Sequence, residues 1–191
     1  MEQLTKKLRG QIGFLYRNRS CFSLSNRKTI VQSVILSVLD YGDLIYMHAS
    51  RSTLKPLDAV YHSALRFITG DSYLTHHCTL YENVGWPSLV DRREQHCFLF
   101  IYKALCGKLP LYLSSLLDPR VTGYSTRSQA HIRFNCPHMN SQQGKTAFMF
   151  YAPDKWDKLQ DSLKLVNLVS IETFKARLED TLQHSVCTCF V

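Results

Sequence analysis

Three clusters of histidine and cysteine contain the side chains that most often bind zinc in proteins. They are His76-His77-Cys78, Cys136-Pro137-His138 and Cys187-Thr188-Cys189. Zinc ribbons and knuckles use paired ligands separated by two residues, and none of the three clusters has that spacing. The sequence therefore predicts no metal site and no cofactor.

Two carboxylates, Asp40 and Asp43, are the other candidates for metal chemistry. With Tyr41 and Gly42 they superficially resemble the Tyr-x-Asp-Asp turn that holds metal in polymerases. That turn needs adjacent aspartates on a hairpin, whereas these two are three residues apart in a segment that is predicted to be helical. We therefore expect helix-end or hydrogen-bonding roles for both carboxylates, and no metal.

Other catalytic patterns are not found in the sequence. Gly144-Lys145-Thr146 lacks the preceding glycine and the strand that a phosphate-binding loop requires. No nucleophile, base and orienting acid form a recognisable group. We expect that the chain is not an enzyme.

Positive charge is concentrated at the start of the chain, whose overall net charge is +8. Residues 1–30 contain one acid, Glu2, and seven lysines and arginines: Lys6, Lys7, Arg9, Arg17, Arg19, Arg27 and Lys28. A basic segment of this kind is typical of proteins that bind nucleic acid or an anionic surface. A solvated face that keeps the protein in solution is the alternative, and charge alone favours neither.

An amphipathic helix over residues 3–18 is predicted to position the first of these cations. Leu4, Leu8, Ile12 and Leu15 recur at helical spacing and form its apolar stripe. The opposite face carries two cations and two glycines, namely Lys6, Gly10, Gly13 and Arg17. Glycine is unfavourable inside a helix, so these two need a reason. They allow either the approach of a phosphate backbone or the close packing of another helix.

The apolar run Ile30–Ala49 is predicted to be the central helix of the fold, over about residues 26–48, and to be buried on all sides. A membrane span is the competing interpretation. Asp40 and Asp43 in the middle of the run argue against it, because carboxylates are costly in lipid. The sequence thus predicts a mostly α-helical bundle without a membrane segment.

The remaining pattern predicts further helices around this centre: Arg51–Thr69, His77–Val84, Ser88–Cys106, Leu111–Leu117, 144–160 and a last helix capped by Ser170. Arg92, His96 and Lys103 form a second, weaker basic strip on the helix predicted over Ser88–Cys106. Residues 119–143 are rich in Pro, Gly and polar residues, which favours an irregular segment with a short strand near 131–135. Aromatic residues in 144–160 are expected to anchor that helix on the core, and base stacking is the alternative.

The seven cysteines are odd in number and irregularly spaced, which does not fit a disulfide framework. We therefore expect reduced thiols and a cytoplasmic or nuclear location. The first residues also lack the apolar run of a signal peptide.

Several stretches together resemble the carboxy-terminal part of LINE-type (non-long-terminal-repeat) retrotransposon reverse transcriptases. The stretches are KLRGQIGFLYRNRSCFSLSNRKTIVQSVILSVLDYGDLIYMHAS, LKPLDAVYHSALRFITG, GWPSLVDRREQHCFLFIYKALCGKLP, GKTAFMFYAPDKWDKLQDSL and SIETFKARLEDTL. They cover nearly the whole chain. None is a catalytic signature, and the resemblance rests on their order and spacing. No zinc knuckle, which some members have near their end, is visible.

The resemblance implies a thumb-like helical region at 1–70, a post-thumb helical region at 71–118, and a crossing segment with C-terminal helices packing on the core at 119–191. In that family the fingers, the palm with its paired aspartates and the endonuclease precede these regions. A thumb holds the primer–template duplex largely through its sugar–phosphate backbone, which agrees with the basic residues of 1–30. The post-thumb region is implied to help bind element RNA or target DNA, with Arg92, Arg93 and Lys103 as candidates.

Two hypotheses about function follow. The first is a non-catalytic fragment of a retrotransposon reverse transcriptase that binds RNA, DNA or an RNA–DNA hybrid through backbone contacts. The second is a helical module for protein–protein interaction, or an unselected remnant, whose partner face is the apolar surface that a palm normally covers.

Overall fold

The computed structural model describes residues 1–120, 132–163, 165 and 168–182. Its regular elements in these ranges are helices, and the predicted mostly α-helical bundle is confirmed. The irregular segment after residue 118 contributes one antiparallel bridge between Pro119 and Phe134. Residues 121–131 of the segment expected to be irregular, 119–143, lie outside the described residues. The chain divides into two compact units, which meet in sequence at Arg93 and Glu94.

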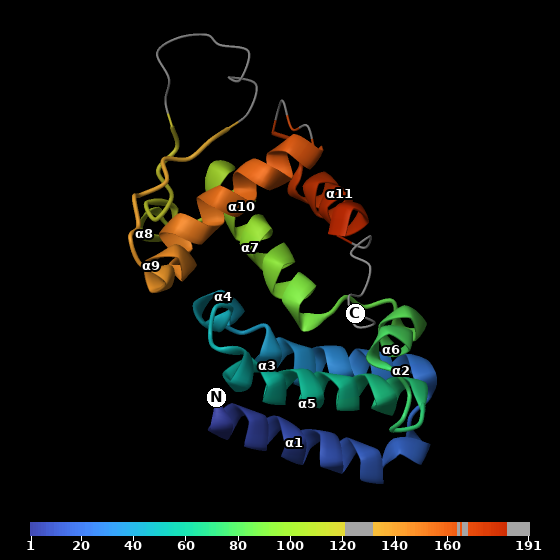
Figure 1. Ribbon diagram of the computed structural model, residues 1–191. Helices are drawn as coiled ribbons and strands as arrows, with labels where there is room; N and C mark the ends of the chain where they lie inside the picture. Colours follow the sequence, from blue (N-terminus) through green and yellow to red (C-terminus); the bar gives the residue numbers. More distant parts are fainter. Residues whose placement is uncertain (121–131, 164, 166–167, 183–191) are drawn as a thin grey trace. The chain divides into compact units, whose positions relative to one another are not determined.

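The first unit contains the N-terminal helices (Figure 1). They are α1 (Glu2–Arg17), the 3-10 turn η1 (Arg19–Cys21), α2 (Leu24–Ile30), the π-helical turn η2 (Val31–Leu36), α3 (Ser37–Leu39), α4 (Asp43–Tyr46), α5 (Arg51–Thr69) and α6 (His77–Val84). The second unit contains most of α7 (Leu89–Leu105), α8 (Leu111–Ser114), α9 (Gln142–Thr146), α10 (Phe148–Leu163) and α11 (Ile171–Leu182).

Helix α5 is the most buried helix of the first unit and contacts α1, α2, η2 and α6. Seven of its residues are buried: Leu57, Val60, Tyr61, Ala64, Leu65, Phe67 and Ile68. Its residues coincide with the predicted helix because both ends carry strong signals. Ser50 caps the start by accepting the N–H of Thr53, and Gly70 ends it in the left-handed conformation, with φ of 90°.

The apolar run that was predicted as one central helix differs from that expectation in two ways. It forms α2, η2 and α3 in succession and stops at Asp40, because Gly42 takes a left-handed conformation with φ of 67°. It is also not buried on all sides, since Ser33 and Ser37 are exposed. Its buried residues are Val31, Ile35, Leu36 and Leu39. The run therefore forms one wall of the bundle, and α5 is the helix at its centre.

An aromatic cluster forms the core of the second unit. Trp156 of α10 is fully buried and donates its indole N–H to the carbonyl of Ile132 at 2.8 Å. Tyr102 of α7 stacks on Phe174 of α11, with ring centroids 3.9 Å apart. The expected anchoring role of the aromatics in α10 is thus confirmed for Trp156. As predicted, Ser170 caps α11 by accepting the N–H of Thr173.

The two units do not follow the expected boundaries at residues 70 and 118. Helix α6 belongs with the first unit because it packs on α5, and Arg66 of α5 donates to the carbonyl of Thr75 just before α6. Helix α7 runs across the division between the units. The ion pair between Lys155 and Glu94 joins α10 to the part of α7 that belongs to the second unit.

Candidate nucleic-acid interface

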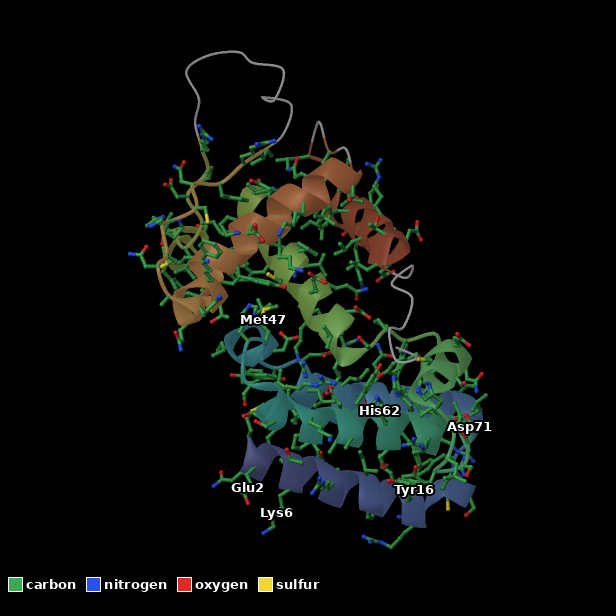
Figure 2. All side chains as sticks on the ribbon, viewed as in Figure 1. Glu2, Lys6, Tyr16, Met47, His62 and Asp71 are labelled. Atoms are coloured by element: carbon green, nitrogen blue, oxygen red, sulfur yellow. The ribbon has the colours of Figure 1, made fainter. Side chains whose placement is uncertain are left out.

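Helix α1 carries four exposed cations: Lys6 and Arg17 lie on its outer face, and Lys7 and Arg9 lie on its two flanks. The helix turns its apolar stripe, with Leu8, Ile12 and Leu15 buried, toward the bundle, so the basic side chains project outward. Figure 2 shows Lys6 pointing away from α5. Within the described residues, none of the four forms a side-chain hydrogen bond or an ion pair. Their charge is therefore available to a ligand.

The two glycines of α1 lie on the same outward face. A Cβ atom added at Gly10 or Gly13 would meet no atom of the described residues within 4 Å. No helix of the described chain packs closely against either glycine, so close packing does not explain them. Their backbone is instead open on the side where the cations project.

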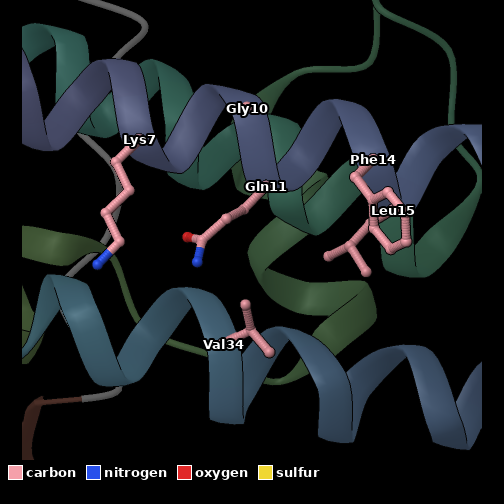
Figure 3. Close-up of a pocket in the computed structure, with 6 residues that line it drawn as sticks. All are labelled: Lys7, Gly10, Gln11, Phe14, Leu15 and Val34. Atoms are coloured by element: carbon pink, nitrogen blue, oxygen red, sulfur yellow. The ribbon is translucent and has the colours of Figure 1, made fainter.

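Two shallow grooves flank α1, and each contains one of the glycines. The first, about 460 Å³, lies between α1 and η2 (Figure 3) and is lined by Lys7, Gly10, Gln11, Phe14, Leu15 and Val34. The second, about 270 Å³, lies between α1 and α5 and is lined by Arg9, Ile12, Gly13, Tyr16, Ala59, Val60 and Ser63. Each groove thus combines an apolar floor, a glycine and one cation.

Phe14 is a residue of this face that the charge pattern did not identify. Its side chain is 58% exposed beside Gly10 and Lys7 in the first groove. The sequence could have identified Phe14 by its position in the helix, because residues 7, 10 and 14 follow the i, i+3, i+7 spacing that puts them on one side. An exposed aromatic ring beside cations is suited to stacking on a base or a sugar.

Three other predicted cations of the first unit are engaged by backbone carbonyls. Arg19 donates from Nε to Phe67 at 3.1 Å, and Arg27 donates from Nε to Phe22 at 3.0 Å. Lys28 donates to Val84 at 2.8 Å and lies 5.5 Å from the centre of the Trp86 ring. The three side chains tie η1 and α2 to their neighbours.

The Arg19 contact also explains the glycine that ends α5. A Cβ atom at Gly70 would lie 2.3 Å from Nη2 of Arg19, so the guanidinium needs a glycine there. The pairing of these residues fixes the end of α5 against the turn after α1.

The predicted cations of α7 differ among themselves. Arg92 forms a two-pronged ion pair with Asp40, with both N–O distances at 2.6 Å. Arg93 is 5% exposed and lies 5.7 Å from the centre of the Tyr46 ring. Lys103 is exposed. Of the strip expected on α7, therefore, Lys103 presents its charge outward and Arg92 holds the end of α3 in place.

The two aspartates of the central run have the structural roles that the sequence predicted for them. Asp40 lies at the C-terminal end of α3 and accepts both hydrogen bonds from Arg92. Asp43 is buried in the first turn of α4, where a carboxylate interacts favourably with the helix dipole.

Burial shifts the pKa of several groups inside the first unit. It raises the pKa of the Asp58 carboxyl, and the charges of Arg93 and Arg51 partly oppose that shift. It lowers the pKa of His62 to about 4, with further contributions from His77, Arg66 and His76. A neutral imidazole at position 62 follows at physiological pH.

The three histidine and cysteine clusters have different outcomes. In the cluster at residues 76–78, one ligand atom from each of His76, His77 and Cys78 lies within 4.8 Å of the others. The cluster at 136–138 brings no such group together in the described part of the chain. Cys187 and Cys189 lie outside the described residues.

None of the described helices combines the length and the apolar character needed to cross a bilayer. The comparisons with known proteins give no assignment: no family model matches the chain, and no curated protein or solved structure is significantly similar to it.

Proposed function

We propose that the chain binds nucleic acid through the sugar–phosphate backbone, using the outer face of α1. The observation that supports this most is that the exposed surface of α1 combines four unpaired cations, two on its outer face and one on each flank, with two glycines that nothing in the described chain covers. The proposal agrees with the thumb of LINE-type reverse transcriptases, which the sequence resembles. Under this proposal the chain is a non-catalytic derivative of such an enzyme.

The dimensions of α1 fit a nucleic-acid strand. Lys6 and Arg17 are eleven residues apart, which corresponds to about 16 Å along the helix axis. A duplex rises about 3.4 Å per nucleotide of each strand, so the basic face spans roughly five nucleotides. Gly10 and Gly13 lie between those cations and let phosphate groups reach the helix backbone without meeting a side chain.

The binding that we propose is directed at the backbone and has little sequence preference. Lysine and arginine contacts to phosphates carry no base information, and binding that depends on them falls steeply with salt. If four phosphates are neutralised, affinity for a duplex falls about 150-fold between roughly 50 and 200 mM salt, because the logarithmic slope is about −0.9 per contact. Phe14 adds a contact that is insensitive to salt.

A non-catalytic role is consistent with the state of the carboxylates. Asp40 forms an ion pair with Arg92, and Asp43 is buried in α4, so neither is an open ligand of the kind that two-metal phosphoryl transfer uses. A primer-extension assay with magnesium or manganese checks this part of the proposal, and we expect no product.

The decisive experiment measures fluorescence anisotropy of a labelled RNA–DNA hybrid at about 50 and 200 mM salt. The test variant reverses three charges on α1, Lys6→Glu, Arg9→Glu and Arg17→Glu. The control makes the same change in net charge on the second unit, with Lys108→Glu, Arg133→Glu and Lys145→Glu, all of which are exposed.

We expect the test variant to lose binding at low salt and the control to keep most of it. Circular dichroism verifies that both remain helical. Equal loss in the two variants would show that only overall charge matters, and the α1 interface would then be rejected.

A protein-binding role is the second candidate, and exposed apolar residues favour it. Tyr41 is 87% exposed and Ile45 is 91% exposed, around the break between α3 and α4. Such residues are typical of surfaces that a partner covers. Light scattering of the wild type and of the double variant Tyr41→Ser/Ile45→Ser tests this role. Self-association through this surface should disappear in the double variant, whereas binding of the RNA–DNA hybrid should stay unchanged.

A further inference from the structure

The start of α6 brings three metal-ligand side chains together. His76 has extended backbone angles, φ of −64° and ψ of 144°, and caps the helix by accepting the N–H of Cys78 on Nδ1 at 3.4 Å. This turn folds the His76 ring back over the first helical residues, His77 and Cys78. As a result, one ligand atom from each of the three lies within 4.8 Å of the others, although the residues are consecutive.

The spacing of these atoms is close to that of a tetrahedral zinc site. Zinc–nitrogen bonds of about 2.0–2.1 Å and zinc–sulfur bonds of about 2.3 Å place ligand atoms roughly 3.3–3.6 Å apart. Atoms that lie within 4.8 Å of one another must therefore approach by at most about 1.5 Å. Rotation about the side-chain bonds of His76, which is exposed, and Cys78 supplies a movement of this size while the packed His77 ring and the helix stay in place.

Neighbouring rings already hold His77 in place. Its ring stacks on that of His62, with centroids 5.2 Å apart and planes at 15°. It also meets Tyr81 edge-on at 5.6 Å and lies 4.1 Å from the ring of His76. A short hydrogen bond of 2.6 Å between His62 and Tyr81 links two of these neighbours. A ligand whose ring is packed in this way loses little freedom when it binds a metal.

The ligand types select the metal. Two imidazoles and one thiolate suit zinc and similar late first-row ions, whereas magnesium and calcium prefer oxygen. His76 is exposed and the other two are partly exposed, so water can reach a fourth position. Arg66 adds a positive charge nearby, which the negative charge of the bound thiolate offsets.

We propose that His76, His77 and Cys78 bind one zinc ion, with the fourth position left to water. Because the three ligands come together only when α6 forms and packs on α5, bound zinc stabilises this corner of the first unit. This site is separate from the basic face of α1. A failure here leaves the nucleic-acid proposal untouched, and the reverse also holds.

Titration of the reduced, metal-free full chain with Co²⁺ tests the proposal, because cobalt in a tetrahedral thiolate site gives a sulfur-to-metal charge-transfer band. We expect this band to saturate at one ion per chain in the wild type. Cys78→Ser should abolish the band. Cys21→Ser, which removes an exposed cysteine elsewhere, should leave it unchanged. His77→Ala should weaken binding by about tenfold or more.

The absence of a band in the wild type would overturn the proposal. So would a band that survives Cys78→Ser, because another thiol would then be the ligand. Far-ultraviolet circular dichroism of Cys78→Ser, a change of one sulfur to oxygen, verifies that α6 is intact. Zinc competition with a chromophoric chelator should reproduce the order of affinities found with cobalt, and the opposite order would also contradict the assignment.

Discussion

Replacing Gly10 and Gly13 by alanine separates the stability of α1 from its proposed ligand binding. Both glycines lie inside the helix, and an added Cβ atom would meet nothing within 4 Å at either site. Alanine is favoured over glycine in a helix interior by about 0.8–1.0 kcal/mol. Because no clash opposes this gain, we expect each substitution to stabilise the first unit by nearly the full amount, and the pair by about 2 kcal/mol.

The same methyl groups would stand where we place the phosphates. Gly10→Ala/Gly13→Ala is therefore expected to bind the RNA–DNA hybrid more weakly, by about threefold or more, with an unchanged salt slope because every cation remains. Such a variant would be more stable and would bind less well, which separates it from the usual substitution that weakens binding by destabilising the fold.

Urea and thermal unfolding, followed by circular dichroism, measure the stabilisation expected from Gly10→Ala and Gly13→Ala. In a unit of this size, 1 kcal/mol corresponds to roughly 4–8 °C in Tm. Gly85→Ala is the matched control: its Cβ would also meet open space, but its φ of 70° is left-handed and strains alanine. We expect this control to lower stability by about 1 kcal/mol.

Two results would refute this reasoning. If Gly10→Ala or Gly13→Ala destabilises the protein, the face is covered by something and is not open. If both stabilise it and hybrid affinity is unchanged, the glycines do not contact phosphates, and the backbone approach proposed for α1 fails even if its cations bind.

Two further predictions concern the interior of the first unit. Arg92→Ala should destabilise it by about 1–3 kcal/mol, because a partly buried Asp40 loses both hydrogen bonds, and a double-mutant cycle with Asp40→Ala in urea should show coupling between them. Additive effects would count against the pair. Burial, with nearby cations, lowers the pKa of His62 from 6.5 to about 4, so protonation favours the unfolded chain. In chelator-treated buffer, the stabilisation that comes from neutral His62 should be fully present above about pH 6.5. The free energy of unfolding should then fall by about 1–2 kcal/mol toward pH 4, after allowance for solvent screening of this partly exposed ring. His62→Gln should flatten that dependence, and an unchanged slope would contradict it.

The sequence predicted elements well where the local signals were complete. Helices α5 and α6 end at Gly70 and Gly85, whose left-handed angles can be anticipated from glycine after an apolar stripe. The outward cations of α1 followed from helical phase alone. These features depend only on residues within one or two turns of each other.

The structure was needed to tell which cations are free. Arg19, Lys28 and Arg92 look like Lys6 in the sequence, but their partners are Phe67, Val84 and Asp40, which are 48 to 56 residues away. Such pairing depends on tertiary packing, so no local pattern predicts it. The cluster at 76–78 was named in the sequence but set aside as a metal site, because it lacks the ligand spacing of known zinc motifs. The structure adds that the three ligand atoms lie within 4.8 Å of one another at the start of α6.

The π-helical turn η2 changes which residues of the apolar run face the same side of the helix. In an α-helix, five residues advance about 140° beyond a full turn, so Val31 and Leu36 would face different directions. Here Ser37 donates its N–H to the carbonyl of Gln32, five residues back, so one turn of the helix takes up an extra residue. The extra residue thus gathers Val31 and Leu36 on one side. A deletion of one residue within 32–34 should restore a regular α-helix in which Leu36 and Leu39 follow Val31 by four and seven positions, so that both stay on the core side. The wide turn is therefore an insertion that sets the register of everything from Leu36 to Asp40.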